Sequence, residues 1–154
     1  MNNYYIKNIW GPGGQKGYPH KDKTEFAEGQ KRAAERFSEC DGFFLYETGG
    51  KENDKIGAKT IFAQGTVQLP PEVITNQDGQ KHGIERGEEK EFPYDVKINL
   101  SVRIHPRDGV PLDTIRKILK SPKEKMQRPG GLIKITKEQF DQLFIELNKR
   151  PQKS

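Results

Sequence analysis

A strict alternation of apolar and polar residues marks one segment in the second half of the chain. The apolar positions are Val96, Ile98, Leu100, Val102 and Ile104, and the polar positions between them are Lys97, Asn99, Ser101 and Arg103. Side chains of a β-strand point alternately to its two faces, so this period of two predicts a strand with one face in the core. The opposite face is expected to meet water or a ligand.

Four other runs have the aromatic and β-branched composition of strands. They cover residues 4–9, 43–48, 56–69 and 132–135. The polar link 49–55 joins two of these runs and predicts a hairpin. Gly57 and Gly65 lower the strand propensity of the run that contains them, which indicates a bulge, a bend or the close approach of a ligand.

The spacing of apolar residues predicts three helices. The first is expected to begin near Asp22, because Glu25 three residues later completes a capping pattern, and to end before Gly42. Its apolar face consists of Phe26, Ala33, Ala34 and Phe37. The second helix is expected to begin at Pro111, which suits a first helical turn, and to stop at Ser121. Its apolar stripe consists of Leu112, Ile115, Ile118 and Leu119.

The third helix has the most complete signal, because Thr136 and Gln139 form a capping box ahead of a regular apolar face. That face consists of Phe140, Leu143, Phe144 and Leu147. Segment 76–91 is almost wholly polar and contains three glycines, which predicts a long flexible loop. The order of elements predicts one α+β domain over residues 1–150, with a tail at 151–154. Its sheet should be curved and mostly antiparallel, or a small barrel, flanked by the three helices.

The composition indicates what such a domain binds. Apolar residues make up 31% of the 154 residues and charged residues 32%, so the core must be small and the loops polar. Lys and Arg number 27 against 22 Asp and Glu, which gives a net charge of +5. Positive charge favours a polyanionic partner such as nucleic acid, although solubility alone gives many proteins a mild excess.

The sequence gives no indication of a membrane span or of export. No apolar run approaches the roughly 18 residues needed to cross a bilayer, and residues 1–10 lack the basic and apolar regions of a signal peptide. The single cysteine, Cys40, cannot form an internal disulfide, which fits a reducing compartment. We therefore expect a cytoplasmic protein.

Residue types that carry out catalysis are sparse. His20, His82 and His105 lie far apart in the sequence, and no histidine lies near Cys40 to activate its thiol. The glycines between positions 11 and 17 are not followed by the Lys-Ser/Thr of a phosphate-binding loop. The sequence predicts a protein without catalytic residues, metal or cofactor, unless distant residues converge in the fold.

Aromatic rings lie close in sequence to basic residues, as stacking on nucleobases requires. Trp10 follows the first predicted strand and precedes glycines, where it can line a pocket or fill the core. A basic group also lies on and after the second predicted helix. It consists of Lys117, Lys120, Lys123, Lys125 and Arg128. These side chains are candidates for contacts with phosphates, and a solvated helix end would give the same pattern.

The first half of the chain has a recognisable order of motifs. It runs Tyr4-Tyr5-Ile6-Lys7-Asn8, then Lys31 to Phe37, then Cys40-Asp41-Gly42-Phe43-Phe44-Leu45-Tyr46-Glu47-Thr48-Gly49, then Ile56-Gly57-Ala58 and Gly65-Thr66-Val67. Over residues 3–69 this order resembles the PUA-like superfamily, with the EVE and YTH domains nearest. Residues 95–148 fit the remaining elements by order alone. The resemblance implies a small β-barrel with flanking helices and a pocket for one modified nucleobase, such as a methylated cytosine or adenine, rotated out of its strand.

The resemblance also implies which residues meet the base. Lys7 and Asn8 match the end of the opening strand, and Trp10 resembles a cage tryptophan. Tyr46 and Thr48 match the hairpin strand that borders the pocket. Tryptophan comes sooner after the opening strand than in YTH domains, and a second cage tryptophan is missing. The aromatic residues that could replace it are Tyr18, Tyr46, Phe62 and Tyr94.

The leading hypothesis is therefore a domain that recognises a modified base in DNA or RNA. A DNA modification or defence system is one context, in which a separate nuclease would carry out any cleavage. Two alternatives stay open. One is a general RNA-binding PUA-like domain without preference for a modified base, and the other is an enzyme whose residues converge only in three dimensions.

Overall fold

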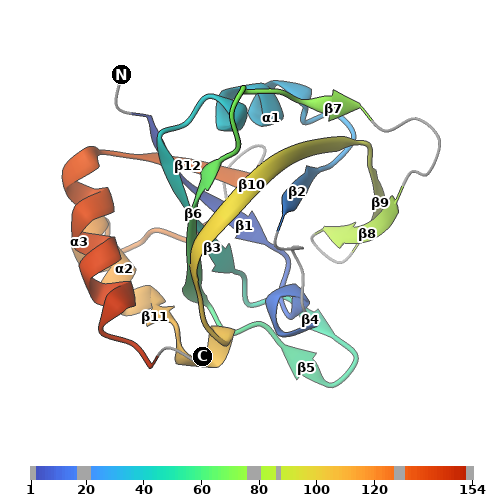
Figure 1. Cartoon of the computed structure of the whole chain (residues 1–154). Coiled ribbons are helices and arrows are strands. Elements are labelled where there is room, and N and C mark those ends of the chain that lie inside the picture. The colour runs from blue at the N-terminus through green and yellow to red at the C-terminus, as the bar shows by residue number, and fades with distance from the viewer. Residues whose placement is uncertain (1–2, 17–21, 76–80, 86–87, 127–130, 152–154) are drawn as a thin grey trace.

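A computed structural model describes residues 3–16, 22–75, 81–85, 88–126 and 131–151. Its main element is a curved sheet in which six strands follow the order β12-β1-β3-β6-β10-β2 (Figure 1). These strands are β1 (Tyr4–Ile9), β2 (Lys23–Phe26), β3 (Gly42–Glu47), β6 (Thr60–Val67), β10 (Tyr94–Arg103) and β12 (Leu132–Ile135). Two short strands complete the sheet, because β11 (Val110–Pro111) pairs with β6 and β7 (Ile74–Thr75) pairs with β10.

Three helices and two small hairpins surround this sheet. The helices are α1 (Lys31–Ser38), α2 (Leu112–Leu119) and α3 (Lys137–Asn148), and two 3-10 turns are η1 (Gly13–Lys16) and η2 (Pro106–Asp108). The hairpins are β4–β5 (Lys51–Glu52 and Lys55–Ile56) and β8–β9 (Lys81–Glu85 and Glu88–Phe92). Figure 1 shows α2 and α3 on one side of the curved sheet and both hairpins on the other. The predicted α+β class, with a curved sheet and three flanking helices, is confirmed.

β1 and β3 form the one parallel pair among the described strands, and all the other pairs are antiparallel. Their register runs from Tyr4 opposite Gly42 to Ile9 opposite Glu47, so both strands end at the same edge. Parallel strands require a crossover connection, and the chain between them supplies it through β2 and α1. The side chains that follow β1 and β3 are therefore brought together.

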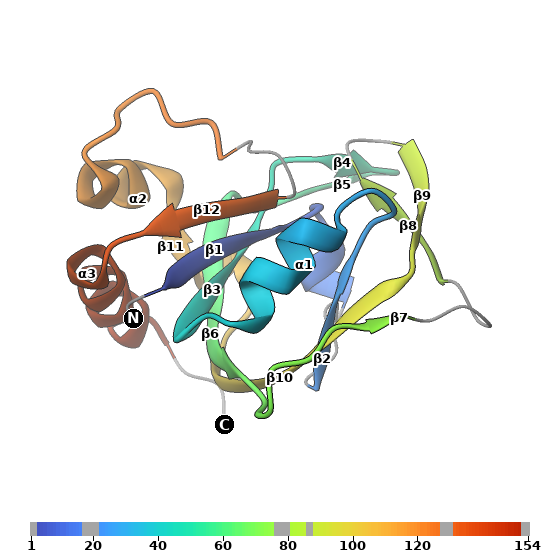
Figure 2. The same ribbon diagram turned by 90° about the horizontal axis from the view of Figure 1, so that it is seen from above.

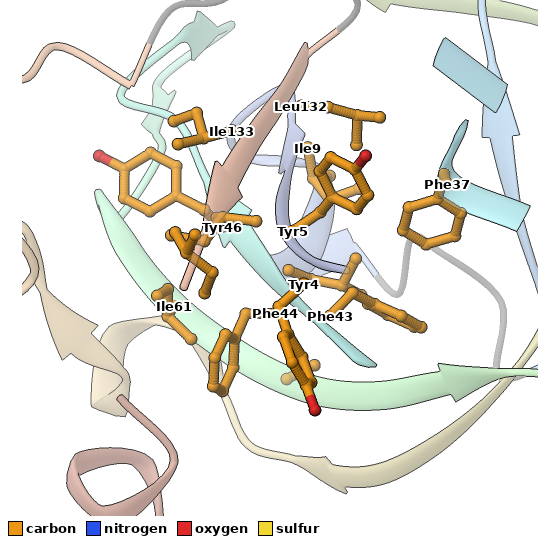
Figure 3. Close-up of a cluster of buried hydrophobic side chains, with 14 of the residues drawn as sticks. Tyr4, Tyr5, Ile9, Phe37, Phe43, Phe44, Tyr46, Ile61, Leu132 and Ile133 are labelled. Atoms are coloured by element: carbon orange, nitrogen blue, oxygen red, sulfur yellow. The ribbon is translucent and has the colours of Figure 1, made fainter. Parts of the chain in front are cut away.

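The core lies on both faces of β3, which explains the nearly continuous apolar run in that strand. Phe43 points toward α1, where its ring centroid lies 4.8 Å from that of Phe37. Phe44 points the opposite way and lies 4.7 Å from the ring of Phe140 on α3, which also contacts Tyr4. Figure 3 shows this buried cluster. The strand is thus fixed from both sides, and its end is a rigid base for the segments that follow.

β2 replaces the expected start of the first helix. Lys23–Phe26 pairs antiparallel with β10 from Tyr94 to Lys97. Gly29 then has a φ of +85°, a left-handed conformation that glycine adopts without strain, and α1 begins only after Gln30. The predicted helix start near Asp22 is therefore wrong, because pairing with a distant strand outweighs a local capping signal. The predicted starts of α2 at Pro111 and of α3 at a capping box are confirmed.

The segment expected to be a long loop contains the hairpin β8–β9, whose register runs from Lys81 opposite Phe92 to Glu85 opposite Glu88. The prediction of a long loop is wrong for these strands, because backbone pairing in a hairpin does not need an apolar side-chain pattern. Residues 76–80 and 86–87 of that prediction lie outside the described residues. No helix in the described ranges is long and apolar enough to span a membrane.

Two ionisable groups of the core keep their protons well above neutral pH. Burial raises the pKa of the Cys40 thiol from its usual 9.0 to about 12, and Asp41 adds to this effect. Burial likewise raises the pKa of the Tyr46 hydroxyl from 10.0 to about 12, against the opposing influence of the Arg116 guanidinium. A thiol that stays protonated is a poor nucleophile, which argues against a catalytic Cys40.

These raised pKa values predict a loss of stability at alkaline pH. The unfolded chain ionises both groups above pH 9 to 10, whereas the folded chain keeps them neutral up to about pH 12. The free energy of unfolding, measured by urea denaturation, should therefore be highest below pH 9 and fall as pH rises toward 12. In the double variant Cys40→Ala, Tyr46→Phe the fall should be shallower. An equally steep fall in the variant would contradict the assignment.

Candidate functional site

Four residues that the sequence assigned to a base site lie together at the C-terminal ends of β1 and β3. Asn8 stands opposite Tyr46 in the parallel register, and the backbone N–H of Thr48 donates to the carbonyl of Ile9 at 2.9 Å. Trp10 follows at the end of β1. We call Asn8, Trp10, Tyr46 and Thr48 the strand-end cluster.

The hairpin β4–β5 is fixed against this cluster by close backbone contacts. The Thr48 hydroxyl accepts hydrogen bonds from the backbone N–H groups of Gly11, at 3.0 Å, and Gly50, at 3.4 Å. A Cβ on Gly11 would lie 2.5 Å from the Cα of Gly57, so glycine is required where these backbones meet. The group that approaches the backbone of Gly57 is the chain itself, at Thr48 and Gly11, and the predicted approach of a ligand at this glycine stays a prediction.

The indole of Trp10 lies against the backbone of Gly50. A Cβ placed on Gly50 would come within 2.5 Å of the indole Cζ2 and 2.7 Å of its Cη2. The indole is half-buried, and its Nε1 is a buried atom without a hydrogen-bond partner among the described residues. One face of the ring is thus covered by protein while its single donor is unused.

A buried carboxylate links the turn after Trp10 to the hairpin. Glu47 is fully buried at the end of β3. Its oxygens accept hydrogen bonds from the backbone N–H of Gln15 at 3.2 Å, the side-chain amide of Gln15 at 2.9 Å and the backbone N–H of Ala58 at 2.8 Å. Because a buried carboxylate needs such donors, Glu47 fixes both loops at once. In the sequence, this role is marked only by an acid at the end of an apolar strand, a feature that does not by itself indicate a site residue.

The segment between α2 and β12 is tied to the other side of the cluster. The Asn8 side-chain amide donates to the carbonyl of Met126, and the Arg116 Nε donates to the carbonyl of Glu124 at 2.9 Å. The Glu124 carboxylate in turn accepts from the backbone N–H of Met126 at 3.0 Å. We call residues 120–126 the connector. Its conformation is therefore set by residues of β1 and α2.

The connector and α2 carry the basic residues that the sequence proposed as phosphate contacts. The side chains of Lys117, Lys120, Lys123 and Lys125 are exposed, and Arg128 lies outside the described residues. Between residues 116 and 125 there are five basic residues and one acid, Glu124, which is buried. The exposed surface of this segment is therefore strongly positive.

Asn8 leaves one acceptor unused. Its side-chain nitrogen is engaged by the Met126 carbonyl, which fixes the orientation of the amide, and its Oδ1 is buried without a partner in the described part of the chain. A buried polar atom of this kind destabilises the fold by about 1–3 kcal/mol unless a partner is supplied. The cluster thus contains one buried acceptor, Asn8 Oδ1, and one buried donor, Trp10 Nε1, that have no partner among the described residues.

The other predicted base-site residues are placed elsewhere. Lys7 points to the opposite face of β1, where it is 6% exposed and its ammonium lies 4.6 Å from the ring centroid of Phe26. Phe62 is fully buried, and Tyr94 is half-buried on β10 opposite Phe26. Tyr18 lies outside the described residues. Within the cluster, Tyr46 is only 2% exposed, so its ring packs in the core.

The residues considered for catalysis do not form a group in the described ranges. His105 caps η2, because its Nδ1 accepts from the backbone N–H of Arg107 at 3.1 Å. His20 lies outside the described residues, and His82 belongs to β8. No set of three or more metal-ligating side chains occurs among the residues that the structure describes.

The fold resembles that of YTH domains. The crystal structure of the Mmi1 YTH domain in complex with RNA superposes with a TM-score of 0.55 over 97% of this chain and 79% of that chain, at 8% sequence identity. A second structure of the Mmi1 YTH domain gives a TM-score of 0.54, also at 8% identity, over 97% of this chain and 76% of that chain. No protein-family model matches the sequence, and no curated protein is significantly similar to it. The resemblance to YTH domains is thus confirmed for the fold.

The contact between Trp10 and Gly50 predicts a large effect of one added methyl group. In Gly50→Ala the new Cβ would overlap the rigid indole, so Trp10 should move toward solvent and the free energy of unfolding should fall by about 1–3 kcal/mol. Because Trp10 is the only tryptophan, its fluorescence emission reports the move as a shift to longer wavelength.

Gly49→Ala is the matched control. Its Cβ would meet only the side chain of Lys59, which is flexible and can move aside. The emission of this variant should match that of the wild type. If the emission of Gly50→Ala, like that of Gly49→Ala, is the same as that of the wild type, the indole does not lie on Gly50.

Proposed function

We propose that this protein binds single-stranded nucleic acid, with the connector holding the phosphate backbone and the strand-end cluster holding one base. The observation that carries the proposal is a pair of buried atoms, Asn8 Oδ1 and Trp10 Nε1, without partners among the residues that the structure describes. They lie next to an exposed basic segment that is bonded to the same asparagine. Because both atoms are buried, a base would supply the two hydrogen bonds after a local movement of the residues that cover them.

The charge of the connector supports the backbone contact. Lys120, Lys123 and Lys125 are exposed on a segment whose only acid is buried, so their ammonium groups can neutralise phosphates and release counterions. Such contacts position the strand without selecting its sequence. The bonds of the connector to Asn8 and Arg116 keep this charge beside the strand-end cluster.

The chemistry of the cluster supports the base contact. Every nucleobase has a polar edge with donors or acceptors and an apolar face, and stacking on an aromatic ring contributes about 1–3 kcal/mol. Trp10 has a half-buried ring, and its N–H and the Asn8 Oδ1 acceptor are buried without a partner in the described ranges. RNA is the first ligand to test, because the Mmi1 YTH domain, which shares this fold, is in complex with RNA.

A more specific version of the proposal is that the protein recognises a methylated base. A methyl group contributes only about 0.8 kcal/mol when it is buried, so preference for a modified base needs apolar contact on more than one side. Tyr46 and Phe62 are buried in the core, and among the described residues of the cluster Trp10 is the aromatic one that is only half-buried. This arrangement favours a second candidate, RNA binding without preference for a modified base.

A binding screen with labelled oligonucleotides separates these functions. Plain RNA, plain DNA and versions that carry one methylated adenine or cytosine are titrated by fluorescence anisotropy at several salt concentrations. Wild-type protein should bind, and Trp10→Ala should weaken binding about tenfold, which corresponds to about 1.4 kcal/mol for one lost stack. If a methylated base is preferred, the same substitution should remove the preference.

Reversing charge on the connector is the complementary variant. The double variant Lys123→Glu, Lys125→Glu should weaken binding to every sequence and reduce the dependence of affinity on salt.

Absence of binding by the wild-type protein would contradict the proposed function. Equal affinity in Trp10→Ala and wild type would leave the connector as the contact and remove the base site.

A further inference from the structure

The stem of the β4–β5 hairpin places a lysine against Gly49, which precedes the glycine that the indole of Trp10 covers. A Cβ on Gly49 would lie 2.4 Å from the Cε and 3.1 Å from the Cγ of Lys59, so the alkyl chain of that lysine runs across Gly49. The indole of Trp10 lies across the next residue, Gly50, in the same way. The two adjacent glycines are thus covered by the stem of Lys59 and the ring of Trp10.

The backbone at Lys59 is held in an unusual conformation by its neighbours. Its φ of 57° is left-handed, which is uncommon for a residue other than glycine and destabilises the folded state. Before it, the N–H of Ala58 donates to the buried Glu47 carboxylate at 2.8 Å. After it, the hydroxyl of Thr60 donates to the carbonyl of Pro106. These bonds maintain the conformation that directs Lys59 across Gly49.

The ammonium of Lys59 has no role within the described part of the fold. The residue is exposed, and no acidic side chain in the described ranges forms an ion pair with it. The position is strained, is kept by surrounding bonds and fixes the stem of a cation that has no counter-ion in the described part of the chain. Such a position suggests a contact with something outside the chain.

The strand-end cluster therefore lies between two basic segments. The connector is bonded to it at Asn8, and the hairpin stem with Lys59 is packed on it at Trp10. Figure 2 shows the connector and the β4–β5 hairpin along the same side of the molecule. A nucleic-acid strand that contacts the connector and places a base at Trp10 would continue toward Lys59.

We infer that Lys59 is a second phosphate-contacting residue, which binds the backbone next to the nucleotide whose base meets Trp10. The inference rests on the proposed function and adds to it a direction, from the connector across the cluster to the hairpin. It also explains why a lysine occupies a left-handed position where glycine or asparagine would be less strained.

Two substitutions at Lys59 separate charge from packing. Lys59→Met keeps an unbranched stem over Gly49 and removes the ammonium, and Lys59→Arg keeps the positive charge. Lys137→Met is the matched control, because Lys137 is also exposed but lies on α3, on the opposite side of the sheet from the hairpin (Figure 1). Melting temperature and Trp10 fluorescence check that each variant keeps the fold around the indole.

The experiment is an anisotropy titration of each variant with a labelled single-stranded RNA at several salt concentrations. Lys59→Met should weaken binding about fivefold and reduce the slope of log affinity against log salt by about 0.7, the value for one phosphate contact on a single strand. Lys59→Arg and Lys137→Met should retain the wild-type slope.

An unchanged slope in Lys59→Met, with wild-type protein that binds RNA and responds to Trp10→Ala, would overturn the role of Lys59 and leave the proposed function intact. If the wild-type protein binds no RNA or DNA, both the proposed function and this inference are wrong. A slope that falls equally in Lys59→Met and Lys137→Met would show a diffuse charge effect and would also overturn the assignment.

Discussion

The parallel, in-register pairing of β1 and β3 is the constraint on which the rest of the structure depends. It ends both strands at one edge, so Asn8 and Trp10 at the end of one strand meet Tyr46 and Thr48 at the end of the other. Core packing on both faces of β3 fixes this edge in position. An antiparallel arrangement would have sent the two strand ends to opposite sides of the sheet.

Polar groups at the strand ends hold the loops of the candidate site in place. Glu47 accepts three hydrogen bonds and holds the turn after Trp10 against the hairpin, while Asn8 holds the connector. Loops positioned by a rigid scaffold commonly carry binding residues, because the scaffold removes the entropy that ordering them would require. The basic connector is therefore bonded to Asn8, and the stem of Lys59 lies across Gly49, next to the glycine that the indole covers.

Local signals in the sequence were sufficient for most of the fold. The alternation around Ile98, the capping box at Thr136 and Pro111 at a helix start each act within a few residues, and the structure confirms them. β2 and the β8–β9 hairpin were missed because their pairing is decided by partners or by backbone geometry that composition does not reveal. For the site, the sequence indicated Trp10 and the basic segment, but Glu47 and Lys59 gain their roles only through contacts with Gln15, Ala58 and Gly49.

Nuclear magnetic resonance tests directly whether the N–H of Trp10, which has no partner among the described residues, meets a ligand. Because Trp10 is the only tryptophan, a ¹⁵N-labelled sample gives a single indole N–H signal. On titration with single-stranded RNA that signal should shift, together with the amides of Gly49 and Gly50, and its exchange with water should slow. Binding that moves the connector amides while the indole signal stays in place would contradict the account.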